Sequence, residues 1–126
     1  PLLARDPVHI VLITPPQVDG VAWGTFQATK FRWEQPKISR TNEQTKQYAE
    51  AVIEVGKQLN IPVVDLYAVS GESSNFCDGL HLSERGNQLL FSELMKTIEK
   101  HWSYLLPQFL PWDGPLWDKE RNDDFP

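Results

Sequence analysis

The sequence predicts an α/β fold in which a parallel β-sheet is covered by helices on both faces. Two short apolar segments, residues 8–13 and 61–67, have the composition of buried parallel strands. An amphipathic helical pattern follows each of them, over residues 41–60 and 83–105, and this alternation is typical of three-layer α/β/α proteins. Because two strands are too few for a stable sheet of this kind, we expect the fold to be incomplete here, with N-terminal strands missing.

The first predicted strand, Val8 to Ile13, is a continuous apolar run that Pro15 and Pro16 bring to an end. Ligands bind at the carboxyl ends of the strands in such sheets, so the next segment is of functional interest. We predict a long loop over residues 15–39. Its aromatic side chains could wall a pocket for an acyl or alcohol group, or could instead pin the loop to the domain; they are Trp23, Phe26, Phe31 and Trp33.

Both predicted helices carry capping signals. Thr41 and Gln44 have the spacing of a capping box, and Asn60 before Pro62 supplies a stop. The apolar stripe between these ends is expected to belong to the core, and consists of Tyr48, Val52, Val55 and Leu59. Ser83 should cap the second helix, whose apolar face consists of Leu90, Leu94, Ile98, Trp102 and Leu105.

Composition argues against two kinds of partner. A formal net charge of −5 and a pI near 5.1 disfavour a nucleic-acid surface, which needs clustered Lys and Arg. No apolar run approaches the roughly 20 residues of a membrane-spanning helix, so we expect no integral membrane segment. The single cysteine, Cys77, leaves no internal disulfide, and we predict that it is a half-buried packing residue beneath its loop.

The most informative stretch is Asp78-Gly79-Leu80-His81, which places a carboxylate three residues before a histidine at the entrance of the last helix. A tight turn through Gly79 would let the Asp78 carboxylate reach Nδ1 of His81. That contact would fix the tautomer and leave Nε2 free to take a proton from a nucleophile. Asp78 and His81 are therefore the candidate catalytic residues, although a carboxylate can also hold a purely structural histidine.

Other residues fit this chemistry less well. Asp65 ends the second predicted strand, where a carboxylate can be catalytic, but a loop-capping role is favoured because Asp78 already fits the orienting role. Ser83 is better explained as a helix cap. No G-x-S-x-G elbow surrounds the serines that precede Asp78, so loop polarity is the expected role of Ser70, Ser73 and Ser74.

A metal site is the second chemical alternative. Asp78 and His81 could ligate a metal together with His9 or His101, but those two histidines lie on a strand start and a distant helix end. The sequence contains no tight cluster of His, Cys and Asp. We therefore expect neither a metal nor a cofactor.

The D-G-L-H-L-S-x-x-G-N run resembles the C-terminal catalytic block of the SGNH hydrolases, also called GDSL esterases/lipases. Within that family the likeness is to the isoamyl acetate-hydrolysing esterase type. The similarity covers most of positions 8–106, in the order that the family shows, and includes residues 8–16, 40–42, 48–49 and 63–67. A flavodoxin-like α/β/α fold is what this resemblance implies.

The resemblance also implies a serine esterase that hydrolyses small carboxylic esters, with His81 as general base and then acid and Asp78 as its orienting group. In such enzymes a serine in a G-D-S block attacks the ester, while a glycine and a G-x-N-D asparagine help to bind the oxyanion. None of these blocks occurs in this sequence, which also opens without methionine.

We therefore expect residues 1–106 to be the C-terminal portion of an SGNH hydrolase domain, and residues 107–126 to be an irregular acidic tail containing Trp and Pro. The upstream sequence of a longer polypeptide would supply the serine, and the isolated chain would be inactive. The alternative is a catalytically inactive fragment of this fold that serves as an interaction module.

Overall fold

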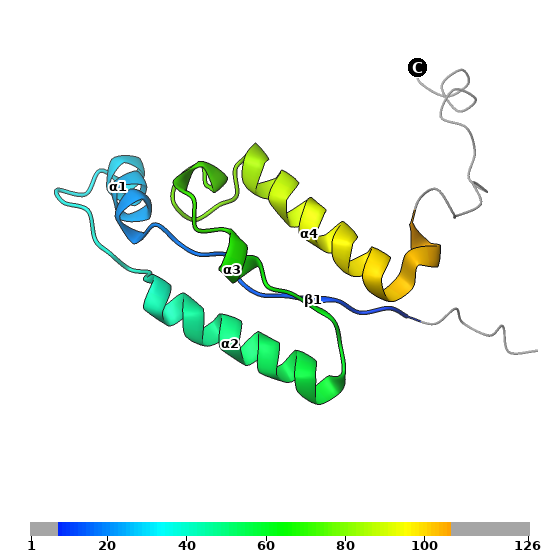
Figure 1. The fold of residues 1–126 in the computed structure, drawn as a ribbon. Coiled ribbons are helices and arrows are strands. Elements are labelled where there is room, and N and C mark those ends of the chain that lie inside the picture. The colour runs from blue at the N-terminus through cyan, green and yellow to red at the C-terminus, as the bar shows by residue number, and fades with distance from the viewer. Residues whose placement is uncertain (1–7, 107–126) are drawn as a thin grey trace, which may run out of the picture.

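The computed structural model describes residues 8–106, which form two strands, four helices and two short 3-10 turns (Figure 1). The predicted tail, residues 107–126, lies outside the described residues. In chain order the elements are β1 (Leu12–Ile13), α1 (Gly20–Phe31), α2 (Asn42–Leu59), β2 (Val63–Val64), α3 (Leu66–Val69), η1 (Ser73–Asn75), α4 (Glu84–Trp102) and η2 (Ser103–Leu105).

The two strands form the predicted parallel pair, with Leu12 aligned to Val63 and Ile13 to Val64. Both are shorter than predicted. The pairing ends where the Thr14 N–H donates to the Val64 carbonyl at 3.0 Å. Directly afterwards Asp65 caps α3, because its carboxylate accepts from the Ala68 N–H. The strand predicted as far as residue 67 is therefore wrong beyond residue 64.

Both long helices begin where their capping signals predicted, and α2 also ends there, whereas α4 ends at Trp102 and gives way to the 3-10 turn η2. Thr41 Oγ1 accepts from the Gln44 N–H, and Asn60 ends α2 in the left-handed conformation with φ of 53°. Ser83 Oγ accepts from the Gly86 N–H at 3.2 Å and so caps α4. Figure 1 shows α2 and α4 on opposite sides of β1, which gives the helix–sheet–helix layering of an α/β/α protein. None of the described helices is both long and apolar enough to cross a membrane.

The long loop predicted over residues 15–39 is wrong, because its centre forms helix α1. The Asp19 carboxylate caps this helix by accepting from the N–H groups of Val21 and Ala22, at 3.1 and 2.9 Å. Arg32 ends it in the left-handed conformation, with φ of 56°. An acidic cap followed by a run free of proline is a helix signal. Here the proline pair shortly before the cap and the aromatic residues between polar ones favoured a loop instead.

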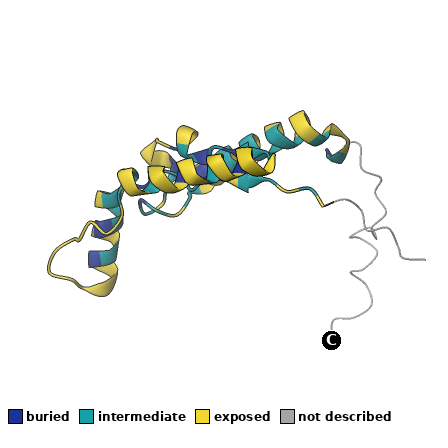
Figure 2. Ribbon diagram, turned by 90° about the horizontal axis from the view of Figure 1, so that it is seen from below, coloured by how far each residue is buried: buried dark blue, intermediate teal, exposed yellow. Residues whose placement is uncertain are grey.

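The core of the described residues is small and lies between the strands and the helices (Figure 2). Its buried apolar members are Val18, Ala28, Ala49, Val64, Leu66 and Leu106. The prediction that the apolar stripe of α2 is core is wrong at several positions, since Tyr48 is 70% exposed and Leu59 is 62% exposed. The reason is geometric: α2 has 18 residues, about 27 Å of helix, while each described strand has two.

We predict that Gly56→Ala lowers the free energy of unfolding by about 1–3 kcal/mol, the usual range for overpacking. An alanine Cβ at this buried position of α2 would lie 2.2 Å from Val63 Cγ2 and 3.0 Å from the Ile61 carbonyl oxygen. Helix propensity alone predicts the opposite sign, a gain of about 1 kcal/mol. Urea unfolding measures the change, with the exposed position Gln47→Ala as control. A more stable Gly56→Ala protein would contradict the packing of α2 on β2.

Candidate active site

The Asp78–His81 segment lies in a closed loop between η1 and α4. Two interactions join the sides of this loop: an antiparallel bridge between Phe76 and Leu82, and a hydrogen bond from the Cys77 N–H to the His81 carbonyl at 3.0 Å. The Ser83 N–H donates to the Asn75 carbonyl at 2.8 Å and ties the loop's exit to η1. We call residues 76–82 the base loop. Its ends are thus held by backbone hydrogen bonds before α4 begins.

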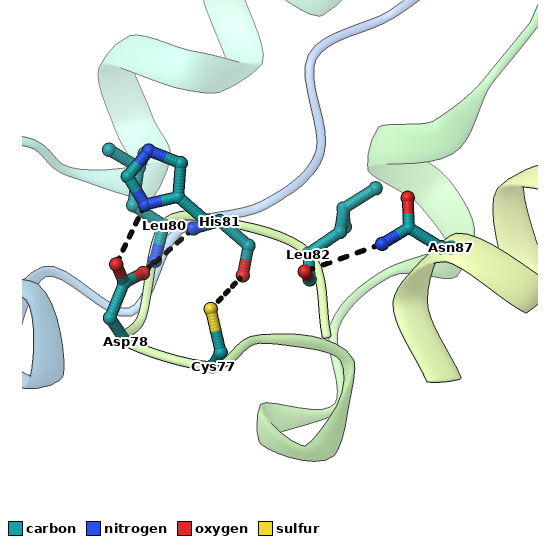
Figure 3. Close-up of polar contacts among 6 residues, drawn as sticks. All are labelled: Cys77, Asp78, Leu80, His81, Leu82 and Asn87. Atoms are coloured by element: carbon teal, nitrogen blue, oxygen red, sulfur yellow. Dashed lines mark hydrogen bonds and ion pairs between the residues drawn. The ribbon is translucent and has the colours of Figure 1, made fainter. Parts of the chain in front are cut away.

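Within the base loop, Asp78 turns back onto His81 as the sequence predicted (Figure 3). One carboxylate oxygen accepts from the N–H groups of Leu80 and His81, at 2.9 and 2.8 Å. The other lies 2.7 Å from Nδ1 of the His81 ring. These three hydrogen bonds fix the orientation of the carboxylate. The Asp78 side chain is only 8% exposed, so little of it is left in contact with solvent.

The His81 ring has a defined tautomer in this arrangement. An ionised carboxylate can only accept hydrogen bonds, so the contact with Asp78 puts the proton on Nδ1. Nε2 then carries the free lone pair, and no described residue forms a hydrogen bond with it. The side chain is 65% exposed. Such an imidazole can accept a proton from an incoming group and share the resulting charge with the carboxylate.

Asp78 is held in its charged form. Burial by itself raises the pKa of this carboxyl, but the hydrogen bonds from the His81 N–H, the His81 ring and the Leu80 N–H outweigh it. Together with the positive charge that the His81 ring carries when it is protonated, they keep the pKa of Asp78 below its usual range. A carboxylate that remains ionised is what an orienting partner of a histidine base requires.

The turn between the two residues depends on Gly79, which has φ of +91°. A Cβ at this position would lie 2.6 Å from both the Asp19 carbonyl oxygen and the Trp23 backbone nitrogen. The first turn of α1 therefore packs directly against the base loop, and the Asp19 N–H donates to the Gly79 carbonyl at 2.8 Å. Only glycine combines this backbone conformation with this approach.

The four aromatic residues between β1 and α2, for which a pocket wall or a packing role was considered, form two separate pairs. Trp23 lies beside His81, with ring centroids 5.6 Å apart and planes at 76°, and Phe26 stacks on Trp23. Phe31 and Trp33 stack on each other instead. Sequence reasoning missed the contact of Trp23 with His81, since the two residues are far apart in the chain and nothing local to either predicts it.

Ser70 and Ser83, which were considered as alternative nucleophiles, have structural roles. Ser70 is fully buried, and its hydroxyl oxygen accepts from the Gln17 N–H at 2.8 Å. Ser83 serves as the cap of α4 and also donates to the Ser74 carbonyl. No serine of the described residues is hydrogen-bonded to His81. Cys77, predicted to be half-buried, is instead exposed, and its Sγ donates to the His81 carbonyl oxygen at 3.4 Å.

The remaining candidates lie away from the base loop. Asp65 has the capping role favoured for it and accepts from the Thr14 hydroxyl at 3.1 Å. His9 packs against Trp102, and its Nε2 lies 2.9 Å from the hydroxyl oxygen of Tyr104. Across residues 8–106, no three His, Cys, Asp or Glu side chains come together in a way that could hold a metal ion.

The described residues combine an α/β layering with a carboxylate–histidine pair on the loop before the last long helix. Residues 5–94 match the family described as GDSL-like lipase/acylhydrolase. The chain therefore belongs to this family, and the predicted SGNH, or GDSL, relationship is confirmed.

Two relatives illustrate the similarity. A GDSL esterase/lipase from Arabidopsis thaliana is 31% identical over 112 residues, which is 84% of this chain and 46% of the relative. The human Isoamyl acetate-hydrolyzing esterase 1 homolog is 36% identical over 108 residues, which is 82% of this chain and 42% of the relative. The chain thus spans less than half the length of these two relatives.

A solved structure supports the predicted fold class. The crystal structure of a lipase/acylhydrolase from Enterococcus faecalis superposes with a TM-score of 0.50 at 32% sequence identity. The match covers 71% of this chain and 42% of that structure. The described residues therefore form part of the α/β fold of this family, as the alternation of strands and helices predicted.

The charged state of Asp78 predicts a pH-dependent contribution to stability. Because its pKa in the folded protein is below the usual value, the contribution is fully present above about pH 4, the ordinary carboxyl pKa. It is lost as the pH falls through the lower, folded value. In urea unfolding, the stability difference between the wild-type chain and Asp78→Asn should therefore be larger at pH 5 than at pH 2.5.

The control for this experiment is Glu99→Gln, which neutralises an exposed carboxylate on α4. Its stability difference from wild type should be similar at both pH values. A difference for Asp78→Asn that stays constant between pH 5 and pH 2.5 would show that the Asp78 carboxylate is not stabilised in its charged form.

Proposed function

We propose that this chain supplies the histidine base and orienting aspartate of a serine esterase that hydrolyses small carboxylic esters. In this proposal residues 1–106 are the C-terminal portion of the hydrolase domain. The serine nucleophile, and the glycine and asparagine that bind the oxyanion, come from polypeptide N-terminal to it. Two facts support this division of the catalytic residues between the chain and upstream polypeptide. The chain spans 42% of the human relative's length, and no serine of the described residues is hydrogen-bonded to His81.

The observation that carries the proposal is the 2.7 Å contact between Asp78 and Nδ1 of an otherwise exposed His81 ring. In the first step, Nε2 of His81 takes the proton of the serine hydroxyl while the serine oxygen attacks the ester carbonyl carbon. The imidazolium then gives this proton to the leaving alcohol oxygen as the ester C–O bond breaks, which leaves an acyl-serine.

Hydrolysis of the acyl-serine uses the same base a second time. Nε2 takes a proton from water, whose oxygen attacks the acyl carbonyl carbon. The proton then returns to the serine oxygen as the carboxylic acid leaves. Throughout, Asp78 stays ionised and stabilises the imidazolium, which is the role that its hydrogen bonds and lowered pKa suit. No step needs a metal or cofactor.

The substrates to test first are small acetate esters, because one relative at 36% identity is named for the hydrolysis of isoamyl acetate. The helix α1 carries the aromatic pair Trp23 and Phe26 close to His81. We propose that this pair forms an apolar wall for the acyl or alcohol group, the first of the two roles considered for these residues.

A chimeric protein provides the test. The segment of the human relative that precedes its matched region would be joined to this chain and assayed with isoamyl acetate and p-nitrophenyl acetate. We expect turnover that His81→Ala lowers by about 10⁶-fold, since loss of the triad histidine costs on this order. Asp78→Asn should cost up to about 10⁴-fold, because the wrong tautomer is then favoured.

The matched control is His101→Ala, which removes an exposed histidine on α4 outside the base loop and should leave turnover unchanged. Circular dichroism establishes that each variant is folded. Near-normal turnover of a folded His81→Ala chimera would exclude His81 as the base. A folded chimera without any turnover would instead favour the alternative of an inactive interaction module.

The 126-residue chain alone should not react with a fluorophosphonate probe. An activated serine must lie beside His81 Nε2, whereas Ser70 is buried and Ser83 is engaged as a helix cap. Mass spectrometry of the probe-treated chain makes the measurement, and the chimera serves as the positive control. A label on Ser70, Ser73 or Ser74 would show that the chain contains its own nucleophile.

A further inference from the structure

Helix α1 forms a wall on one side of the base loop. Its first turn is joined to the loop by the hydrogen bond from the Asp19 N–H to the Gly79 carbonyl, at 2.8 Å. One turn further along, the indole of Trp23 meets the His81 imidazole with ring planes at 76°. This is the edge-to-face arrangement that aromatic rings favour. The residue that carries the free Nε2 is therefore in direct contact with α1.

The His81 ring has few other restraints. The hydrogen bond to Asp78 holds Nδ1, but one contact point leaves the ring free to tilt about it. Most of the side chain is exposed. Among residues 8–106, Trp23 makes the only ring-to-ring contact with His81. The direction in which Nε2 points is thus fixed by two contacts, the Asp78 carboxylate and the Trp23 ring.

Trp23 is itself rigidly held. Its backbone N–H donates to the Asp19 carbonyl at 2.9 Å, inside the capped first turn of α1. The ring of Phe26, one turn later, stacks on the indole with centroids 5.6 Å apart and planes at 20°. The indole N–H is buried and finds no acceptor among the described residues. The ring, rather than this donor, is therefore the part of the side chain that acts on His81.

We propose that Trp23 is a positioning residue for the base: its ring, supported by Phe26, holds the His81 imidazole so that Nε2 points at the nucleophile. This inference rests on the proposed function of His81. It predicts that Trp23→Phe, which retains an aromatic ring and removes the unpaired N–H, preserves the behaviour of His81. Trp23→Ala should not.

The first test is spectroscopic and independent of turnover. In ¹⁵N-labelled 126-residue chain, the imidazole signals of His81 are assigned by their loss in His81→Gln. Exchange of the Nδ1 proton with water should rise about three- to tenfold in Trp23→Ala, the factor that loss of an aromatic pair contributes. It should stay near the wild-type rate in Trp23→Phe and in Phe31→Ala. The latter removes an exposed ring from the same helix away from His81.

The second test uses the ester-hydrolysing chimera. Trp23→Ala should lower kcat by about tenfold or more, because misplacing a catalytic group by a fraction of an ångström has such a cost. KM should rise as well, because the same ring belongs to the proposed apolar wall, so the fall in kcat is the part of the effect that reports on the position of the base. Phe26→Ala should give a smaller loss of kcat, because it removes the ring that supports Trp23. If Trp23→Ala fails to fold, this second variant still tests the positioning role.

Wild-type exchange rates and kcat in folded Trp23→Ala or Phe26→Ala would overturn the proposal. So would a Trp23→Phe protein as impaired as Trp23→Ala, since the retained ring would then have no effect. Faster exchange in Trp23→Ala together with an inactive wild-type chimera would support the positioning contact and overturn the proposed esterase function, so the two failures are distinguishable.

Discussion

The conformation of Gly79 is the constraint on which the candidate site depends. Its positive φ turns the chain so that Asp78 and His81 face each other. Its missing Cβ leaves room for α1, since a Cβ there would lie 2.6 Å from the carbonyl oxygen of Asp19 and from the backbone nitrogen of Trp23. One residue therefore makes both the local turn and the docking of α1. The hydrogen bond between Asp78 and His81 follows from the turn, and the ring contact between His81 and Trp23 follows from the close approach of α1.

The site combines a well-held carboxylate with an accessible base. Asp78 is almost fully enclosed and has three hydrogen bonds, whereas the His81 side chain is largely exposed. This asymmetry suits a histidine that must exchange protons with a group that is not part of the described residues. The loop keeps its shape because Asn75 and Ser83 join its exit to η1 and to the capped start of α4.

Local signals in the sequence predicted much of this arrangement, and long-range contacts account for what they missed. The caps at Thr41 and Ser83 and the Asp78–His81 hydrogen bond each involve residues at most three apart, so their spacing was enough. The extent of the strands depends on which neighbours pair with them, and the local pattern overestimated it. Helix α1 was not predicted, because Pro15 and Pro16 favour a loop and lie only a few residues before the Asp19 cap. The contact of Trp23 with His81 arises only when α1 docks on the base loop.

The central claim is that His81 serves as the base for a serine supplied from outside this chain. The most direct measurement is a crystal structure of the chimera after reaction with a fluorophosphonate. The account predicts that the labelled serine lies in the segment taken from the relative, with its Oγ about 3 Å from His81 Nε2. A labelled serine out of reach of His81, or one that belongs to this chain, would contradict it.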